Sequence, residues 1–168
     1  MHTNSESFVR RDTDDENPAH AIEIDAPAER VWDTLHQHRG LPPTWNLFIP
    51  RSSTGTVASG ERLEVRIAPP GGAAMTFRPT VLAVEPAREL RWLGHSLVPG
   101  LFDGEHEFQI YSLGPSRVRF AQQERFTGVL VPLFARNLDD HTLRGFNAMK
   151  AALKSRVEPV VRNQPVAA

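Results

Sequence analysis

The chain has 168 residues, of which 40% are hydrophobic and 23% are charged, and its 19 basic residues are balanced by 20 acidic ones. This length and composition are typical of one globular domain, and the lack of a basic excess argues against nucleic acid or an anionic membrane as a partner. Because the chain contains no cysteine, disulfides, thiolate metal sites and thiol nucleophiles are excluded.

The first 18 residues are polar, and acidic side chains are concentrated between Asp12 and Glu16. Such a segment buries too little apolar surface to offset the entropy lost on ordering, so residues 1–18 are predicted to form a disordered polar leader. The segment also lacks the apolar run of a signal peptide or a membrane span. We therefore expect a cytoplasmic protein without stable membrane insertion.

The first predicted elements are a strand and a short helix. Residues 20–25 alternate between apolar and polar side chains, which favours a strand. Pro27 stands at an early helical position, where its missing N–H costs nothing, and Val31 and Leu35 form an apolar stripe behind it. The glycine and prolines that follow end this helix, and a second short helical turn is expected around residues 44–48.

The middle of the chain consists of period-two segments separated by turn residues, a pattern typical of an antiparallel meander. Six strands are predicted here, and the first strand brings their number to seven. The six segments are residues 54–58, 62–68, 75–85, 89–96, 104–112 and 117–127.

After Pro132, apolar residues recur at spacings of three and four, which predicts one long amphipathic helix. A curved antiparallel sheet must cover its apolar face, and this helix is the only predicted element long enough to do so. The predicted class is α+β, a helix-grip fold in which a curved seven-stranded antiparallel sheet wraps around the long C-terminal helix, with two short helices after the first strand. The domain is expected to span residues 19–161, and residues 162–168 to form a loose tail.

Several short motifs stand at characteristic places in this order of elements. They are residues 26–32 (APAERVW), 45–46 (WN), 79–82 (PTVL), 85–86 (EP) and 104–108 (GEHEF). In these motifs the chain resembles the SRPBCC superfamily, also described as Bet v 1-like or START-related, and within it the polyketide cyclase/dehydrase-like branch. The resemblance covers residues 19–161 and implies an internal cavity.

The resemblance implies that the cavity binds or transports a small hydrophobic ligand, which is lipid-like, aromatic or polyketide-like. Because relatives of this fold have many activities, two other functions stay open. One is a polyketide cyclase/dehydratase-type enzyme, and the other is a module that binds a protein partner. No cofactor is expected, and no metal, since His36 and His38 are two apart and point in different directions. The sequence leaves homodimerisation open.

Strand alternation predicts which polar side chains face the helix. Gln122 and Glu124 share the inner face of the last strand with apolar residues, and His106 does so on the strand before it. A turn at Gly114 would pair His106 with Gln122 and place Glu124 on the diagonal from His106, roughly 7–8 Å away. His106 and Glu124 could then hold or share a proton near neutral pH.

The candidate ligand-binding residues are the inward aromatic and polar side chains together with two residues of the long helix. They are Trp45, Phe48, Phe77, Trp92, Phe102, His106, Phe108, Gln122, Glu124, Phe126, Phe146 and Met149. His106 and Glu124 are also the candidate acid–base groups of the enzyme alternative. A structural interpretation stays open too, in which the His106–Glu124 pair only fixes strand register and the aromatic residues only fill the core.

Overall fold

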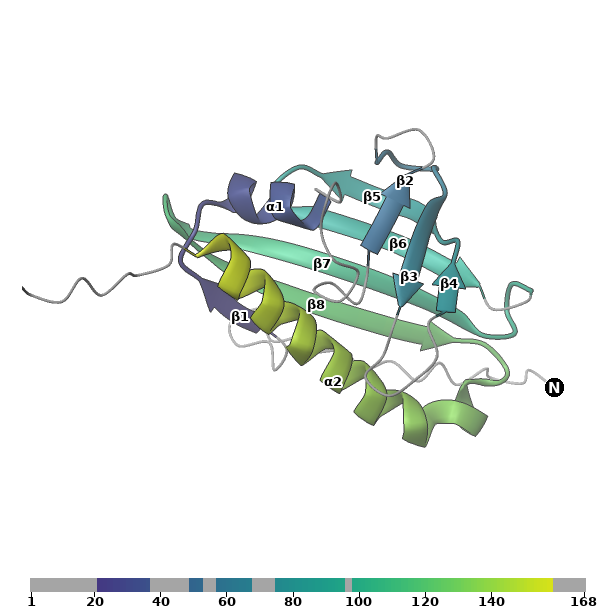
Figure 1. Ribbon diagram of the computed structural model, residues 1–168. Coiled ribbons are helices and arrows are strands. Elements are labelled where there is room, and N and C mark those ends of the chain that lie inside the picture. The colour runs from purple at the N-terminus through teal and green to yellow at the C-terminus, as the bar shows by residue number, and fades with distance from the viewer. Residues whose placement is uncertain (1–20, 37–48, 53–56, 68–74, 96–97, 159–168) are drawn as a thin grey trace, which may run out of the picture.

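The computed structural model describes residues 21–36, 49–52, 57–67, 75–95 and 98–158. Within these residues the chain forms eight strands and two helices (Figure 1). In chain order they are β1 (Ala21–Ile24), α1 (Ala28–His36), β2 (Ile49–Ser52), β3 (Leu63–Ile67), β4 (Met75–Phe77), β5 (Thr80–Glu85), β6 (Glu89–His95), β7 (Asp103–Gly114), β8 (Arg117–Thr127) and α2 (Val131–Val157).

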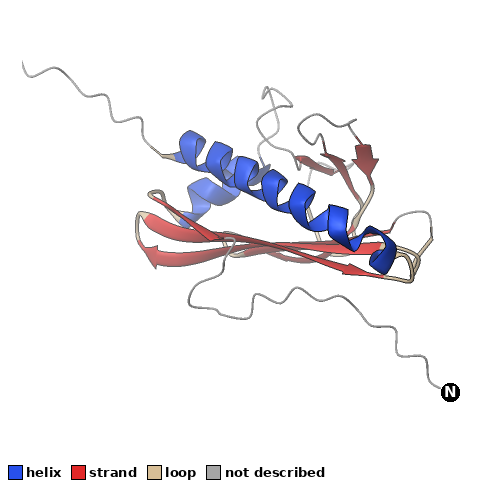
Figure 2. Cartoon of the chain, turned by 90° about the horizontal axis from the view of Figure 1, so that it is seen from below, coloured by secondary structure: helices blue, strands red, loops and turns tan. Residues whose placement is uncertain are grey.

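The strands form two antiparallel sheets. A five-stranded sheet has the order β1-β8-β7-β6-β5, and a three-stranded sheet has the order β2-β3-β4. Both helices and the small sheet lie on the same side of the large sheet, and α2 runs across that face (Figures 1 and 2). The predicted α+β helix-grip class is therefore confirmed.

The strands differ in detail from the predicted single sheet of seven. Residues 75–85 do not form one strand, because Pro79 is buried between β4 and β5 and has no N–H to donate to a ladder. As a result, β4 pairs with β3 in the small sheet, whereas β5 pairs with β6 in the large one. A bridge between Arg62 and Thr80 links the residue before β3 to the first residue of β5, and Val81 N–H donates to the Glu61 carbonyl oxygen beside it at 2.8 Å.

Two predicted elements between α1 and β3 fall wholly or largely outside the described residues. These are the short helical turn at residues 44–48 and the strand at residues 54–58. The structure instead has β2 at Ile49–Ser52, where the sequence pattern predicts no strand. β2 pairs with β3 and so becomes an edge strand of the small sheet.

The core lies between the large sheet and the two helices. In α1, Val31 and Leu35 are buried, as their spacing predicts. The buried apolar residues of α2 from residue 145 onward are Phe146, Met149, Leu153 and Val157. The large sheet contributes Ile24, Val81, Leu90, Trp92, Phe108, Ile110, Val118 and Phe120. Burying a large apolar side chain of this kind stabilises a fold by about 1.5–3 kcal/mol.

The β7–β8 hairpin turns later than predicted. Gly114 pairs with Arg117, so the turn consists of Pro115 and Ser116, and the ladder is irregular between Ser112 and Gly114. Proline presets the φ angle that a turn requires and cannot donate to a ladder, which places the turn at Pro115 instead of Gly114.

This later turn changes the predicted cross-strand partners while keeping the predicted faces. His106 lies directly opposite Glu124, and Phe108 lies opposite Gln122. The predicted pairing of His106 with Gln122 is therefore wrong by two residues. Because the shift is an even number, every side chain stays on its predicted face, and His106 and Glu124 become direct neighbours instead of diagonal ones.

The C-terminal end of α2 is attached to the end of β1. Lys154 Nζ donates hydrogen bonds to the Glu23 carbonyl oxygen at 2.7 Å and to Glu158 Oε1 at 2.6 Å. The same Glu158 oxygen accepts the backbone N–H of Asp25 at 2.8 Å. Burial acts to raise the pKa of Glu158, but the hydrogen bonds from Asp25 and Lys154 outweigh it and lower that pKa. The helix is thereby held against the edge strand of the large sheet.

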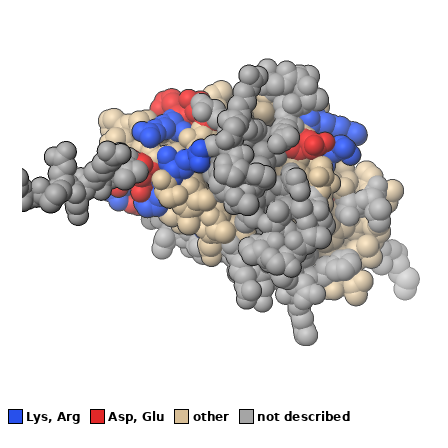
Figure 3. Space-filling view, in the orientation of Figure 1, with Lys and Arg blue, Asp and Glu red and all other residues tan. Residues whose placement is uncertain are grey.

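Charged side chains of both signs lie near one another on the surface seen in Figure 3. Ion pairs among the described residues include Arg78 with Glu64 at 3.4 Å and Arg88 with Glu85 at 3.1 Å. Exposed pairs of this kind each contribute about 0–1 kcal/mol to stability, so they add little to the fold. Neither described helix has the length and apolar character needed to cross a bilayer.

Candidate functional site

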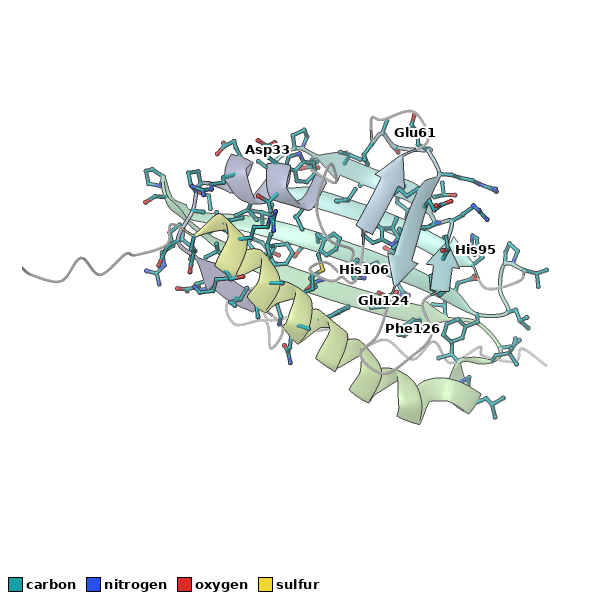
Figure 4. The ribbon with its side chains drawn as sticks, in the orientation of Figure 1. Asp33, Glu61, His95, His106, Glu124 and Phe126 are labelled. Carbon is teal, nitrogen blue, oxygen red and sulfur yellow. The ribbon has the colours of Figure 1, made fainter. Side chains whose placement is uncertain are left out.

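The candidate site is centred on His106 of β7 and Glu124 of β8. Figure 4 shows the two side chains beside each other, and His106 Nδ1 forms a hydrogen bond with Glu124 Oε2. The His106 side chain is only 1% exposed and the Glu124 side chain is 15% exposed. A polar pair thus stands on the inner face of the sheet among apolar neighbours, as the strand pattern predicts.

Aromatic rings surround His106. Trp92 stacks on the imidazole with ring centroids 4.8 Å apart and planes 17° apart. Phe108 and Phe146 meet the ring edge-to-face, at centroid distances of 4.5 and 5.3 Å. These residues come from β6, β7 and α2, so the sheet and the long helix together fix the position of the imidazole.

The hydrogen bond to Glu124 determines what His106 can do chemically. With the carboxylate ionised, Nδ1 must carry the proton that it donates, which leaves Nε2 as the acceptor of the neutral ring. If Nε2 then takes a proton, the adjacent carboxylate stabilises the resulting imidazolium. The pair can therefore accept and return one proton in an environment that excludes most water.

Gly104 makes room for the Glu124 carboxylate. A Cβ atom at position 104 would lie 2.9 Å from Glu124 Oε1, so a larger residue there would force the carboxylate to move from its present position. Gly104 lies on β7 one position after Asp103, and the register places it opposite Phe126. Its role was not predicted, although a glycine inside a strand pattern is a known signal of close approach.

Gln122 is the third polar residue of the inner face. Its side chain is fully buried, and its Nε2 donates to the Met149 Sδ of α2 at 3.0 Å. Among the described residues, no donor meets its carbonyl oxygen Oε1. The structure thus brings together Gln122 of β8 and Met149 of α2, which are both candidate ligand-binding residues.

The remaining candidate residues divide into three places. Phe102, just before β7 begins, and Phe126, near the end of β8, contact each other with ring centroids 5.3 Å apart. Phe77 is half-buried on β4 in the small sheet, opposite Val65. Trp45 and Phe48 lie outside the described residues, so their predicted role stays a prediction.

A family model described as polyketide cyclase/dehydrase and lipid transport matches residues 19–162. The chain belongs to this family. The resemblance that the sequence motifs indicate is thereby confirmed. No curated protein sequence matches the chain.

Solved structures similar to this polyketide cyclase/dehydrase family member include two bacterial proteins and one plant protein. The Zhui aromatase/cyclase from Streptomyces sp. R1128 is 19% identical, with a TM-score of 0.64 over 86% of this chain and 94% of that one. A START superfamily protein from Mycobacterium smegmatis is 19% identical, with a TM-score of 0.57 over 82% and 93%. A point mutant of norcoclaurine synthase from Thalictrum flavum is 15% identical, with a TM-score of 0.56 over 82% and 91%. At these identities the likeness shows the fold alone.

At the far end of β6 and β7, a second polar cluster in this family member was not predicted. His95 Nδ1 and Asp103 Oδ1 are 2.8 Å apart across the two strands, and Asp103 Oδ2 accepts the Gly100 N–H at 2.9 Å. Burial acts to raise the pKa of Asp103, but the hydrogen bonds from His95 and Gly100 and the charge of His95 lower it below the ordinary value of 3.8. The cluster ties the β6–β7 loop to the strands that it connects.

The lowered pKa of Asp103 predicts a pH-dependent contribution to stability. Because the carboxylate binds its proton less readily in the folded chain, its contribution is full above the ordinary value of 3.8 and is lost as pH falls through the lowered folded pKa. Asp103→Asn is expected to lower the urea midpoint more at pH 6 than at pH 3, because the contribution of the carboxylate declines as pH falls toward the lowered folded pKa. Asp33→Asn, at an exposed position of α1, should leave the midpoint almost unchanged. A constant loss for Asp103→Asn at both pH values would contradict the prediction.

Proposed function

We propose that this family member binds a small hydrophobic ligand between the large sheet and α2, against the wall formed around His106. The observation that carries the proposal is a row of polar groups on the inner face, the buried His106 and Gln122 with the partly buried Glu124, set in an aromatic surface. Small-molecule sites have this composition, because apolar walls supply affinity and a few polar groups fix orientation. Membership of a family described by lipid transport supports the same function.

The candidate residues would contact different parts of the ligand, depending on their positions in the fold. Trp92, Phe108 and Phe146 would contact the ligand near His106, with Met149 contributing from α2. Phe102 and Phe126 would contact it where β7 begins and β8 ends. We include Phe77, Trp45 and Phe48 in the proposed wall, within a domain of residues 19–161.

A ligand retained from the host is the expected result for this function. Native mass spectrometry of the chain purified from its own host should show an adduct that organic solvent removes. Trp92→Leu should lower the retained fraction, because it removes the largest ring beside His106, whereas Leu82→Ala, at an exposed site on β5, should not. A host-purified chain that carries no adduct and binds no apolar dye would overturn the proposal.

A second candidate function is an enzyme of the cyclase/dehydratase type, and the hydrogen-bonded His106–Glu124 pair favours it. In such a reaction His106 Nε2 would remove a proton from a carbon next to a carbonyl group and later return it, while Glu124 stabilises the imidazolium. The likeness to an aromatase/cyclase supports this candidate only through the shared fold. With an identified substrate, Glu124→Gln and His106→Ala would abolish turnover while the ligand still binds.

We further propose that the chain works in the cytoplasm and does not bind nucleic acid. Its 19 basic residues are balanced by 20 acidic ones, and this lack of a basic excess supports the proposal that it does not bind nucleic acid. Homodimerisation is a separate question, which light scattering answers directly. A protein-binding role is the remaining alternative, and it predicts neither a retained small molecule nor turnover.

A further inference from the structure

The buried amide of Gln122 has only one orientation that suits its surroundings. Met149 Sδ is an acceptor without a proton to donate, so the group that faces it at 3.0 Å must be the NH2 of the amide. The carbonyl oxygen Oε1 must then point to another place. The sulfur therefore decides which end of the Gln122 side chain is left for other partners.

The carbonyl end of this amide is an acceptor with its hydrogen bond unmade. Gln122 is completely buried, and no donor among the described residues reaches Oε1. Buried polar groups in folded proteins are nearly always paired, because an unpaired acceptor has lost its water without replacement. An amide held by one end and unsatisfied at the other is therefore suited to a partner that arrives from outside the chain.

The polar groups next to Gln122 add acceptor capacity more than donor capacity. Glu124 is two positions further along the same face of β8, roughly 7 Å away along the strand, and its carboxylate only accepts when ionised. The buried cation nearest in sequence to Met149 is Lys150. Lys150 lies one turn before Lys154, which contacts β1, so the two lysines share one side of α2.

We propose that Gln122 Oε1 selects ligands that carry a hydrogen-bond donor, namely a hydroxyl group on an apolar skeleton. The inference rests on the proposed ligand-binding function and adds a specificity-determining residue to it. A ligand hydroxyl would donate to Oε1 and satisfy the buried acceptor. An ether or hydrocarbon of the same shape would leave Oε1 unpaired and would also keep water away from it.

The test uses two probes that differ only in the donor, 2-naphthol and 2-methoxynaphthalene. Isothermal titration of the full chain should give a dissociation constant about tenfold lower for 2-naphthol, the effect of one hydrogen bond. In Gln122→Met, which keeps the volume and removes the acceptor, the ratio of the two constants should fall to about one. Gln123→Met is the matched control, since Gln123 is adjacent but lies on the opposite face, and it should keep the tenfold ratio.

Two further readouts separate the outcomes. The side-chain carbonyl carbon of Gln122, observed by NMR, should shift on addition of 2-naphthol and not of 2-methoxynaphthalene. Gln122→Met should melt at or above the melting temperature of the wild type, because it removes an unpaired buried group, so loss of the tenfold ratio would not reflect unfolding.

Equal binding of both probes by the wild type would overturn the inference and leave ligand binding intact. Failure of the wild type to bind either naphthalene or an apolar dye would overturn the proposed function and the inference together.

Discussion

His106→Ala is expected to lower the free energy of unfolding by about 3 kcal/mol, the cost of truncating a large buried ring and leaving a charged partner unpaired. The imidazole contacts three aromatic rings and is 1% exposed, so its removal leaves a void that the rigid sheet cannot close. The carboxylate of Glu124 would remain on the inner face without its hydrogen bond. Urea unfolding monitored by circular dichroism measures this loss.

A double-mutant cycle shows how much of the loss belongs to the pair. His106→Leu and Glu124→Leu alone each leave one member of the pair without its partner, whereas the double variant replaces both polar groups by apolar ones. The double variant should be more stable than the sum of the single losses predicts, by about 1–3 kcal/mol. If the losses simply add, the two side chains do not act as a unit, and the proton-sharing role of the pair would lose its basis.

Gly128→Ala is expected to have an effect of similar size, by a different cause. Gly128 follows β8 and has a φ angle of +127°, which side-chain-bearing residues rarely adopt. A Cβ atom there would lie 2.6 Å from the Leu101 carbonyl oxygen, and backbone atoms cannot move aside as a flexible side chain can. We expect a loss of about 3 kcal/mol in the free energy of unfolding.

A second glycine provides the control for this prediction. Gly60 has a φ angle of +84°, but a Cβ atom built there meets nothing within 4 Å. Gly60→Ala should therefore cost only the backbone strain, about 1 kcal/mol. The difference between the melting temperatures of the two variants measures the cost of the close approach between Leu101 and position 128. Equal melting temperatures would mean that the loop yields to the new methyl group.

Periodicity allowed much of the fold to be predicted from the sequence. The strand at 117–127 agrees with β8 at both ends, and the spacing of Phe146, Met149 and Leu153 identified the buried face of α2. Parity alone placed His106 and Gln122 inside, because they share a face with apolar residues that had to be buried, Phe108 and Ile110 on β7 and Val118 and Phe120 on β8. These are local signals, and each needs only a few consecutive residues.

The incorrect predictions come from features that periodicity does not contain. The β7–β8 register depends on whether the chain turns at Gly114 or at Pro115, and the alternating pattern fits both choices. The break at Pro79 lies inside the alternating segment 75–85, where the pattern favours one long strand over two short ones. In both cases a single proline decides the geometry.

The candidate site was predicted only in part, for a similar reason. Opposite strands bring His106 to Glu124, so the pair could be anticipated once the hairpin was recognised. The contact of Gln122 with Met149 joins a strand to a helix 27 positions later, and no spacing rule specifies which helix residue meets which strand residue. The orientation of the amide, and with it the unpaired Oε1, could be found only from the three-dimensional structure.

The place of β1 in the large sheet has a consequence for synthesis of the protein. β1 pairs with β8, Ile22 opposite Phe120, and its following residue Asp25 contacts Glu158, which is 133 positions later. On the ribosome, Ile22 and Ile24 therefore emerge long before their partners, a delay on the order of 10 s at usual elongation rates. Throughout that time a nascent chain exposes an unpaired apolar strand, so we expect chaperones to bind this protein mainly while it is being translated.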